Sequence, residues 1–353
     1  MKAGSVKKIL IIQTAFLGDV ILTLPLVQAL KRTAPDSEID FIAIPETEEI
    51  VGNHPDISNV IVYDKHGNQR SLSSFLSFRR RLRAANYDVV LSPHRSMRSC
   101  LLAKSTHART RVGFDNSALK HCFTDLLPWR FGAHEIERNL SLLQPLAGSG
   151  TVLDKGRASR SFPQISISEP HRSEAERFLS DHKVKKPYAV VAPGTVWETK
   201  RYPAEMMVEV VRKLSERFAN VVVIGGGKDV DLIHDFDALD EKVSLAIGVM
   251  PIMSSAEIIR ESSLLVANDS APIHIASAFN VPTVAIFGPT VKDFGFYPYH
   301  DRSVVIEING LGCRPCSIHG GTRCPIVTFK CMRGISPDEI VEKSLQISGM
   351  DPE

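Results

Sequence analysis

The 353-residue chain lacks several features that mark common classes of protein. None of its apolar runs reaches the roughly 18 to 20 residues that a membrane span needs. Neither sign of charge is in excess, since 42 Lys and Arg face 40 Asp and Glu, and a net charge of +2 gives no reason to expect a nucleic-acid partner. The G-x-G-x-x-G turn of nicotinamide-binding proteins does not follow the first strand expected in the chain. These absences argue against a membrane-spanning protein, a nucleic-acid binder and a dehydrogenase.

A cleavable leader is not expected either. The stretch Met1–Leu24 begins with lysines and turns apolar, as a signal peptide does. However, Gln13, Thr14, Gly18 and Asp19 interrupt it, and no small-residue cleavage site follows cleanly. We interpret it as a core strand running into a helix, and we expect a cytoplasmic protein. Six cysteines in that compartment are more typical of thiols or metal ligands than of disulfides.

The length and composition indicate a globular chain of two domains, with 43% hydrophobic and 23% charged residues. In the first half, short apolar runs alternate with helical patterns, and continuous apolar runs are typical of strands buried on both faces. Strands are expected at Lys8–Gln13, Ile39–Ile44, Val60–Tyr63, Asp88–Leu91 and Arg111–Phe114, and helices at Asp19–Arg32 and Ile136–Leu146.

The second half repeats this alternation after Gly148–Pro170, a segment rich in Gly, Ser and Pro that we interpret as the linker. Strands are expected at Tyr188–Ala192, Val221–Ile224, Val243–Ala246, Leu264–Ala267 and Thr283–Phe287, and helices near Ala204–Phe218, Asp229–Phe236, Ser254–Glu261 and Ser270–Phe279. The pattern predicts α/β domains at 1–155 and 156–353, each with a doubly wound parallel sheet. Ligands of such sheets bind beyond the carboxyl ends of the strands.

Polar loops follow several of these strands. In the first half, Thr14 to Asp19 join a strand to a helix, where Gly18 permits a tight turn and Asp19 either caps the helix or projects toward a ligand. In the second half, Gly194 and Thr195 offer phosphate donors and Lys200 a mobile positive charge, or else they form an ordinary solvated loop.

Two further loops in the second half have the same character. Asn268–His274 opens a helix, with Asp269 or Ser270 as its cap and free N–H groups for a diphosphate. The glycine run Gly225–Gly227 precedes Asp229 and Asp231, either of which is placed to accept from a ribose hydroxyl, although this signal alone is weak.

Four cysteines lie late in the chain at a spacing that fits a structural metal site. They are Cys313, Cys316, Cys324 and Cys331, with His319 between them. A C-x-x-C pair followed by two more cysteines is found in zinc and iron–sulfur sites, but the second pair is too widely spaced for a zinc ribbon. Reduced thiols and a local disulfide remain the alternatives.

The motifs together resemble those of a known family. The order and spacing of Phe16-Leu17-Gly18-Asp19-Val20, Pro193-Gly194-Thr195, Lys200-Arg201-Tyr202-Pro203, Asn268-Asp269-Ser270 to His274 and Phe287-Gly288-Pro289-Thr290 are similar to those of the ADP-heptose:lipopolysaccharide heptosyltransferases of glycosyltransferase family 9. The resemblance covers about residues 7 to 345, and the cysteine segment looks like that of heptosyltransferase II-like members.

This resemblance implies a GT-B fold, in which two Rossmann-like domains face each other across a cleft, the first binding the acceptor and the second the donor. It implies transfer of heptose from ADP-heptose to the inner core of lipopolysaccharide, with inversion by direct displacement. Asp19 matches the general base and Lys200 the lysine at the donor phosphates. The other donor positions that it implies are Thr195, Asp229 or Asp231, Met253 near the adenine, and Asp269, Ser270, Ala271 and His274. Val196 replaces a second hydroxyl residue beside Thr195.

Gly18, Arg95 and Arg98 are expected on the acceptor side, because the two arginines follow a strand end and suit a phosphorylated lipid A–core acceptor at the inner membrane surface. Arg79 to Arg83 are interpreted instead as a solvated helix face. No D-x-D motif occupies a suitable loop, so neither magnesium nor another cofactor is expected to be required. Two alternatives stay open: a transferase or epimerase that uses a UDP-sugar, and a non-catalytic nucleotide-sugar-binding module.

Overall fold

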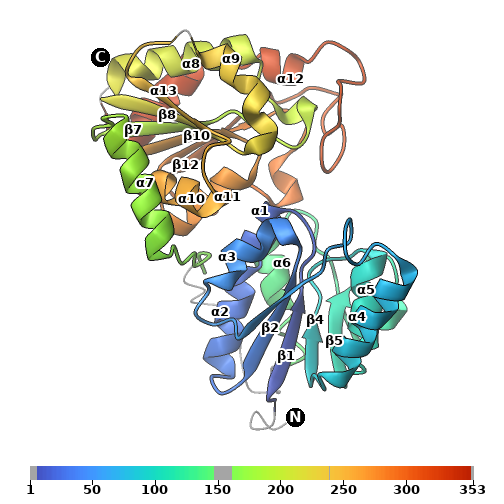
Figure 1. Ribbon diagram of the computed structural model, residues 1–353. Helices are drawn as coiled ribbons and strands as arrows, with labels where there is room; N and C mark the ends of the chain where they lie inside the picture. Colours follow the sequence, from blue (N-terminus) through green and yellow to red (C-terminus); the bar gives the residue numbers. More distant parts are fainter. Residues whose placement is uncertain (1–5, 147–160, 238, 351–353) are drawn as a thin grey trace. The chain divides into compact units, whose positions relative to one another are not determined.

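The computed structural model describes residues 6–146, 161–237 and 239–350. The chain divides into two compact units, Met1–Ser166 and Ile167–Glu353, which are described separately below (Figure 1). The predicted division between residues 155 and 156 and most of the predicted linker lie outside the described residues. The end of that linker belongs to a helix, since α7 begins at Glu169.

The first unit contains a six-stranded parallel sheet in the order β3-β2-β1-β4-β5-β6. Its strands are β1 (Lys8–Ile12), β2 (Glu38–Ala43), β3 (Asn59–Val62), β4 (Val89–Leu91), β5 (Thr110–Phe114) and β6 (Asp125–Leu127). After Lys8, the central strand β1 is apolar and buried from Ile9 to Ile12, because helices cover both faces of the sheet. The first predicted doubly wound sheet is therefore confirmed.

The helices of this unit form two layers (Figure 1). They are α1 (Leu17–Ile21), α2 (Leu24–Thr33), α3 (Glu48–Gly52), α4 (Leu72–Ala84), α5 (Met97–Ser105) and α6 (Glu135–Ser141). Helix α2 packs on α6, and α4 packs on α5. Phe78 and Leu82 of α4 join Leu10 and Ile12 of β1 in one apolar core, so α4 is held to the sheet through one side only.

The single helix predicted over Asp19–Arg32 is wrong. The structure ends α1 at Ile21 and begins α2 at Leu24. Pro25 lies in the first turn of α2, where it has no N–H to donate to a continuous helix and where its fixed backbone angle suits a helix start.

The second unit contains another six-stranded parallel sheet, in the order β12-β11-β10-β7-β8-β9. Its strands are β7 (Tyr188–Ala192), β8 (Asn220–Gly225), β9 (Val243–Ile247), β10 (Leu264–Asn268), β11 (Thr283–Phe287) and β12 (Ser303–Glu307). Strands β7, β10 and β11 are buried throughout. The second predicted sheet is confirmed as well.

Helices lie on both sides of this sheet (Figure 1). They are α7 (Glu169–Asp181), α8 (Ala204–Arg217), α9 (Ile233–Phe236), α10 (Ile252–Glu261), α11 (Ala271–Phe279), α12 (Lys330–Arg333) and α13 (Pro337–Ser348). Apolar residues of α8 and α13 share one core with inward-facing residues of the strands, and α10 packs on α7 and α11. None of the helices in the described part of the chain is both long and apolar enough to cross a membrane.

Two further sequence expectations differ from the structure. Residues Asp229–Phe236 do not form one helix, because Gly227–Leu232 adopt a 3₁₀ conformation before the short helix α9. Strands β6 and β12 were not expected. Both are edge strands with partly exposed residues, and their apolar runs, residues 126–127 and 304–306, are shorter than the run of about four or more that signals a buried strand.

Candidate functional site

Each sheet has one point at which the strand order reverses. In the first unit this point lies between β1 and β4, and in the second it lies between β7 and β10. In doubly wound sheets, ligands bind beyond the carboxyl ends of the strands at this point, because the loops diverge there and leave a crevice. The loops that leave these four strands carry most of the predicted site residues.

At the first switch point, the loop after β1 is joined to the loop after β4 by side-chain hydrogen bonds. Thr14 Oγ1 lies 2.9 Å from Nδ1 of His94, and the Ser99 hydroxyl lies 2.9 Å from the same nitrogen. Lys65, which follows β3, donates from Nζ to the carbonyl oxygen of Thr14 at 3.1 Å. Burial lowers the pKa of His94 to about 4, helped by the positive charges of Lys65 and Arg95, so this imidazole is neutral at physiological pH.

Asp19 follows the loop after β1, half-buried in the first turn of α1, and its carboxylate is near enough to Arg95 to raise the pKa of that group. The residue at the N-cap position of α1 is Phe16, so Asp19 does not occupy the cap that the alternative interpretation gave it. Gly18 is the second residue of α1 and is helical, because the turn out of β1 is completed before Leu17. The tight turn expected at Gly18 is therefore wrong, whereas the placement of Asp19 at the carboxyl edge of the sheet agrees with the expectation.

The two predicted arginines follow β4 and have different surroundings. The Arg95 guanidinium lies 4.7 Å from the centre of the Trp129 ring. The buried guanidinium of Arg138 lies 4.4 Å from the centre of the same ring. Burial lowers the pKa of Arg95, while the carboxylates of Glu135 and Asp19 oppose that shift. Arg98 is exposed and donates to the Lys65 carbonyl oxygen at 3.2 Å. Arg95, Arg98 and Lys65 thus place three positive charges around the first switch point.

At the second switch point, a buried ion pair joins the two central loops. Lys200 Nζ lies 2.6 Å from Oδ2 of Asp269, and the two side chains are 14% and 7% exposed. Thr290, in the loop after β11, donates from its hydroxyl to the same carboxylate oxygen at 2.7 Å. Asp269 therefore holds the ammonium of Lys200 at the carboxyl edge of the sheet, and Thr290 fixes the carboxylate in turn.

Asn268 ties the same loops together through its side-chain amide, which is fully buried. Its Oδ1 accepts from the backbone N–H of Tyr202 at 3.1 Å, and its Nδ2 donates to the carbonyl oxygen of Pro193 at 2.7 Å. One residue at the end of β10 thus fixes both the turn after β7 and the segment that carries Lys200. The sequence analysis placed Asn268 in a ligand loop but assigned it no such bridging role.

Helix α11 begins at this point and directs its N-terminus toward the edge of the sheet. Ser270 is its N-cap residue, but the Ser270 hydroxyl donates to the Asn268 carbonyl oxygen at 3.3 Å and does not cap the helix. His274 is buried, and its Nδ1 has no hydrogen-bond partner among the described residues. Burial lowers the pKa of His274 to about 3, and the Lys200 charge adds to the shift. The site therefore combines a positive helix end, an ammonium group and a neutral imidazole, which suits a polyanion.

Other predicted donor residues are already engaged within the unit. The Thr195 hydroxyl donates to the Trp197 carbonyl oxygen at 2.6 Å. Asp229 accepts from the Gly226 N–H at 2.9 Å, and its carboxylate packs so closely on Gly194 that a Cβ at position 194 would lie 2.5 Å from it. This contact explains why the turn needs glycine at position 194. Met253 lies on α10 with its side chain fully buried.

The segment that carries the first three clustered cysteines is attached to the Lys200 loop. Thr199 and Gly321 exchange two hydrogen bonds, from Thr199 N to the Gly321 oxygen at 3.0 Å and from Gly321 N to Thr199 Oγ1 at 2.7 Å. The rings of Trp197 and His319 lie 6.4 Å apart, inclined by 20°. We refer to this connection between residues 197–199 and 319–321 as the clasp. It makes a late part of the chain a support for the Lys200 loop.

The cysteines themselves do not fit a metal centre. No group of three or more His, Cys, Asp or Glu side chains is arranged to hold a metal ion within residues 6–146, 161–237 and 239–350, so the structural metal that the spacing suggested is not supported. Cys316 is exposed, whereas Cys331 is buried on α12 among apolar residues, so their environments differ. Burial raises the pKa of Cys331 to about 11, with a contribution from Cys316. All four are free thiols.

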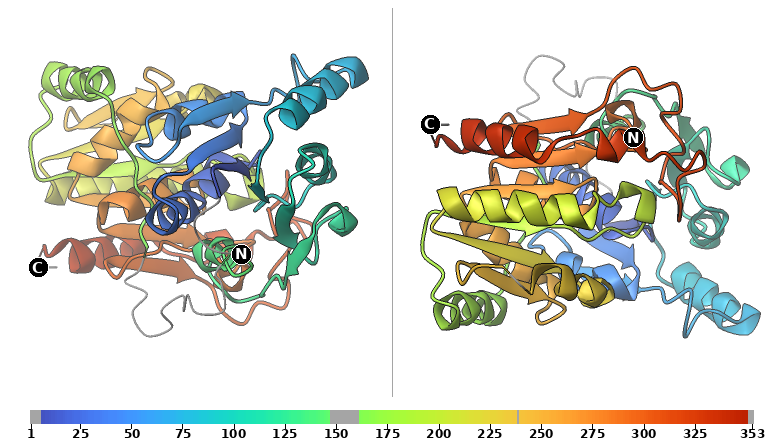
Figure 2. Two further views of the ribbon diagram at one scale, coloured as in Figure 1. Left: turned by 90° about the horizontal axis from the view of Figure 1, so that it is seen from below. Right: turned by 90° about the horizontal axis from the view of Figure 1, so that it is seen from above.

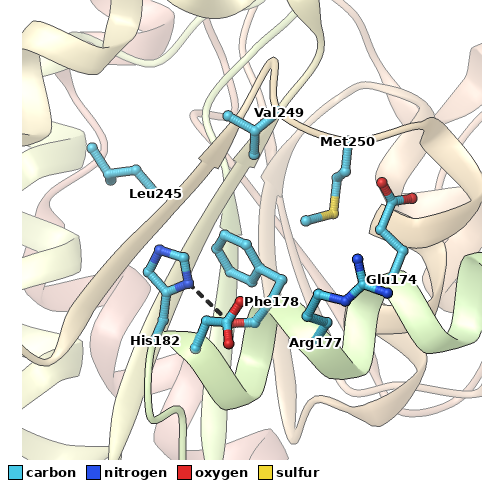
Figure 3. A pocket seen from close by; sticks show the side chains of 8 residues that line it. Glu174, Arg177, Phe178, His182, Leu245, Val249 and Met250 are labelled. Atoms are coloured by element: carbon cyan, nitrogen blue, oxygen red, sulfur yellow. Dashed lines mark hydrogen bonds between the residues drawn. The ribbon is translucent and has the colours of Figure 1, made fainter.

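A separate hollow of about 300 Å³ lies along α7 (Figure 3). Glu174, Arg177 and Phe178 of α7 line it together with His182 at the C-cap of that helix and with Met250, and the Phe178 and His182 rings stack at 4.1 Å. Its lining mixes acidic and basic groups and includes none of the loops at the switch point between β7 and β10. The switch point, and not this hollow, has the charge that a nucleoside diphosphate needs.

The two Rossmann-like units, each with polar loops at its switch point, have the fold of the glycosyltransferases of the GT-B class. The comparison with protein families identifies the particular one. Residues 75–322 match the model of glycosyltransferase family 9 (heptosyltransferase), and the chain belongs to this family. The resemblance expected from the motifs is confirmed, and the protein is a glycosyltransferase.

Individual relatives agree with this assignment. The chain is 28% identical over 289 residues to lipopolysaccharide heptosyltransferase 3 of Escherichia coli K12, covering 77% of this chain and 80% of that protein. A glycosyltransferase family 9 structure from Veillonella parvula is 25% identical and superimposes with a TM-score of 0.83, covering 97% of both chains. The structure of Escherichia coli ADP-heptose LPS heptosyltransferase II has a TM-score of 0.73 at 21% identity, over 97% of this chain and 98% of that one, and it supports the fold.

Proposed function

We propose that this enzyme transfers heptose from ADP-heptose to a sugar of the lipopolysaccharide inner core, with inversion at the anomeric carbon. The observation that carries the proposal is the buried pair of Lys200 and Asp269 at the start of α11, in a member of the heptosyltransferase family. The names of the two Escherichia coli relatives supply the donor and the acceptor class.

The second unit is suited to the leaving group. As the bond between the sugar and the diphosphate breaks, negative charge grows on the phosphate oxygens. The Lys200 ammonium and the N–H groups at the start of α11 stabilise that charge, and Asp269 and Asn268 keep them in place beforehand. Because these donors do not reorganise as the charge develops, they lower the barrier as well as strengthen binding.

The first unit is suited to the acceptor. Direct displacement requires the attacking hydroxyl to lose its proton, and Asp19 at the edge of the first sheet is the carboxylate that takes it. His94 is neutral and hydrogen-bonded to Thr14, so it orients polar groups without competing as a cation. Lys65, Arg95 and Arg98 surround this point with positive charge, which fits an acidic or phosphorylated core sugar on a lipid anchor. Transfer then takes place at the cytoplasmic face of the inner membrane, with the enzyme bound peripherally.

Mass spectrometry of transfer reactions tests the proposal. The purified enzyme is mixed with ADP-heptose or with a UDP-hexose. The acceptors are deacylated lipid A–core molecules that end either in Kdo or in the first heptose. The expected result is that the mass of one of these acceptors increases by one heptose when ADP-heptose is the donor, and that no acceptor gains mass when the UDP-hexose is the donor. Transfer from the UDP-sugar would favour the alternative donor, and binding of ADP-heptose without product on any core acceptor would favour a non-catalytic module.

A further inference from the structure

The positive charge of the protein is concentrated in one segment of the first unit. Residues 65–109 contain ten Lys or Arg and a single acidic residue, Asp88, so the segment has a net charge of +9, whereas the whole chain has +2. Three of these cations, Lys65, Arg95 and Arg98, lie at the switch point described above. Most of the others lie on α4, which has no acidic residue. The proposed acceptor site does not account for the charge on α4.

Apolar and basic side chains share the outer face of α4. At 100° per residue, Leu72, Leu76, Arg80 and Arg83 fall within an arc of about 80°. All four are exposed, and Leu72 and Leu76 are 74% and 40% exposed. Figures 1 and 2 show α4 at the margin of the first unit. The two leucines occupy the first turns and the arginines the last, so the helix has an apolar end and a basic end.

The folding of the unit does not account for this outer face. Phe78 and Leu82 attach α4 to the core from the opposite side. Arg79 donates from Nε to the Ser105 hydroxyl at 2.5 Å, which fastens α4 to α5. On α5, Met97 is also exposed, at 57%, next to the exposed Arg98. Leucine and methionine side chains left in water beside arginines are typical of helices that lie in a membrane interface.

We propose that the outer face of α4, formed by Leu72, Leu76, Arg80 and Arg83, docks the enzyme on an anionic phospholipid bilayer. The charge selects this occupant, because a helix with arginines and no acidic residue of its own is attracted to anionic headgroups, while the two leucines enter the boundary of the acyl chains. This inference rests on the proposed function in one respect: a lipid-anchored acceptor is presented at such a surface. It also replaces the interpretation of Arg79 to Arg83 as a merely solvated face.

Vesicle co-sedimentation of the full chain tests the docking face. Vesicles of phosphatidylcholine mixed with phosphatidylglycerol are compared with vesicles of phosphatidylcholine alone. Wild type is expected to bind the anionic vesicles and to be released by added salt, since screening weakens the contacts of the arginines. The double variants Leu72→Ser/Leu76→Ser and Arg80→Gln/Arg83→Gln are each expected to lower the partition coefficient by about 10-fold or more.

Matched controls separate this face from general surface effects. Leu126→Ser removes a leucine of similar exposure, 43%, from β6 of the same unit, and Arg212→Gln/Arg217→Gln removes two exposed arginines from α8. Both controls should bind vesicles as wild type does. The proposal would be overturned if the α4 variants bound vesicles as well as wild type does, or if wild type bound neutral vesicles as well as anionic ones. Dimerisation through α4 in place of vesicle binding would also overturn it.

Activity on a deacylated acceptor distinguishes this inference from the proposed function. The α4 variants should transfer heptose to that water-soluble acceptor at the wild-type rate, because none of the four residues lies at a switch point. Loss of vesicle binding with normal transfer would support the docking face. If vesicle binding depended on α4 but the wild-type enzyme transferred heptose to none of the core acceptors, the docking face would stand and only the proposed function would be refuted.

Discussion

Replacing Lys200 with alanine has two separable consequences. The first is the loss of a charge-assisted contact to the donor diphosphate, worth about 1.5 to 3 kcal/mol, which corresponds to a decrease of roughly 10- to 150-fold in kcat/KM. The second is that the Asp269 carboxylate, 7% exposed, loses its counter-ion and keeps the hydrogen bond from the Thr290 hydroxyl, so that its charge is left uncompensated at the proposed diphosphate site. Removing one member of a fully buried pair costs about 3 to 5 kcal/mol, and the 14% exposure of Lys200 places the expected loss of stability near the lower end.

A double-mutant cycle with Asp269→Asn separates the two consequences. Asparagine keeps the shape of Asp269 but removes its charge, so the Lys200→Ala/Asp269→Asn variant should regain much of the melting temperature that Lys200→Ala loses. It should not regain donor affinity, because the ammonium is still missing. Thermal melts measure the first quantity, and calorimetric titration with ADP together with steady-state kcat/KM measures the second. Lys200→Arg, which keeps the positive charge, is the conservative control.

The result that would refute this reasoning is recovery of catalysis in the double variant. If kcat/KM returned to within about threefold of wild type, a residual loss well below the roughly 10- to 150-fold expected for a charged contact, Lys200 would serve only as the counter-ion of Asp269. A Lys200→Ala variant with normal stability and a decreased affinity for ADP would instead show that the buried pair contributes little to folding.

Three further outcomes are expected. Asp19→Asn should lower turnover by roughly 10²- to 10⁴-fold while ADP binding is unchanged, and retention of more than about a tenth of the turnover would exclude Asp19 as the base. His274 has a folded pKa of about 3, below its unfolded value of 6.5, so the unfolded state binds more protons between these values and stability falls as the pH falls through 6.5. From pH 7 to pH 5 this residue should cost about 2 kcal/mol, and denaturant melts of His274→Gln should lack that decrement. Cys331→Ser should destabilise the fold by about 1 to 3 kcal/mol because it buries a hydroxyl, whereas the exposed Cys316→Ser should leave the melting temperature unchanged.

Most of the fold could be predicted because its signals are local. Continuous apolar runs such as Tyr188–Ala192 occur where helices cover both faces of a sheet, and all ten predicted strands were found. Strand β12 escaped because its apolar run is short, with only Val304, Val305 and Ile306 between the polar residues Ser303 and Glu307. The break between α1 and α2 depends on Pro25, whose position in a helix can be either a start or a kink, and only the packed structure decides between them.

The sequence indicated which loops carry the candidate site, but not which hydrogen bonds and ion pairs connect their side chains. The rule that ligands lie beyond strand ends pointed to Asp19, Lys200 and Asp269, and it would also have reached Lys65, which follows β3. The partners of these residues could not be inferred, because a hydrogen bond such as that between Thr290 and Asp269 depends on side-chain directions across two loops. The bridging role of Asn268 depends on three segments arriving together, and no single window of sequence contains them.

The clasp has a consequence for the order in which the protein is made. The Lys200 loop is fastened by Gly321, 122 residues after Thr199, and the Tyr202 hydroxyl donates to the Ile335 carbonyl oxygen, 133 residues later. At about 5 to 20 residues per second, the ribosome adds Ile335 roughly 7 to 27 seconds after Tyr202. The first unit has all of its own residues by Ser166 and is able to fold during that interval. The nascent chain therefore completes its first unit well before its second, and the Lys200 loop receives its full set of contacts only after residue 335 has been made.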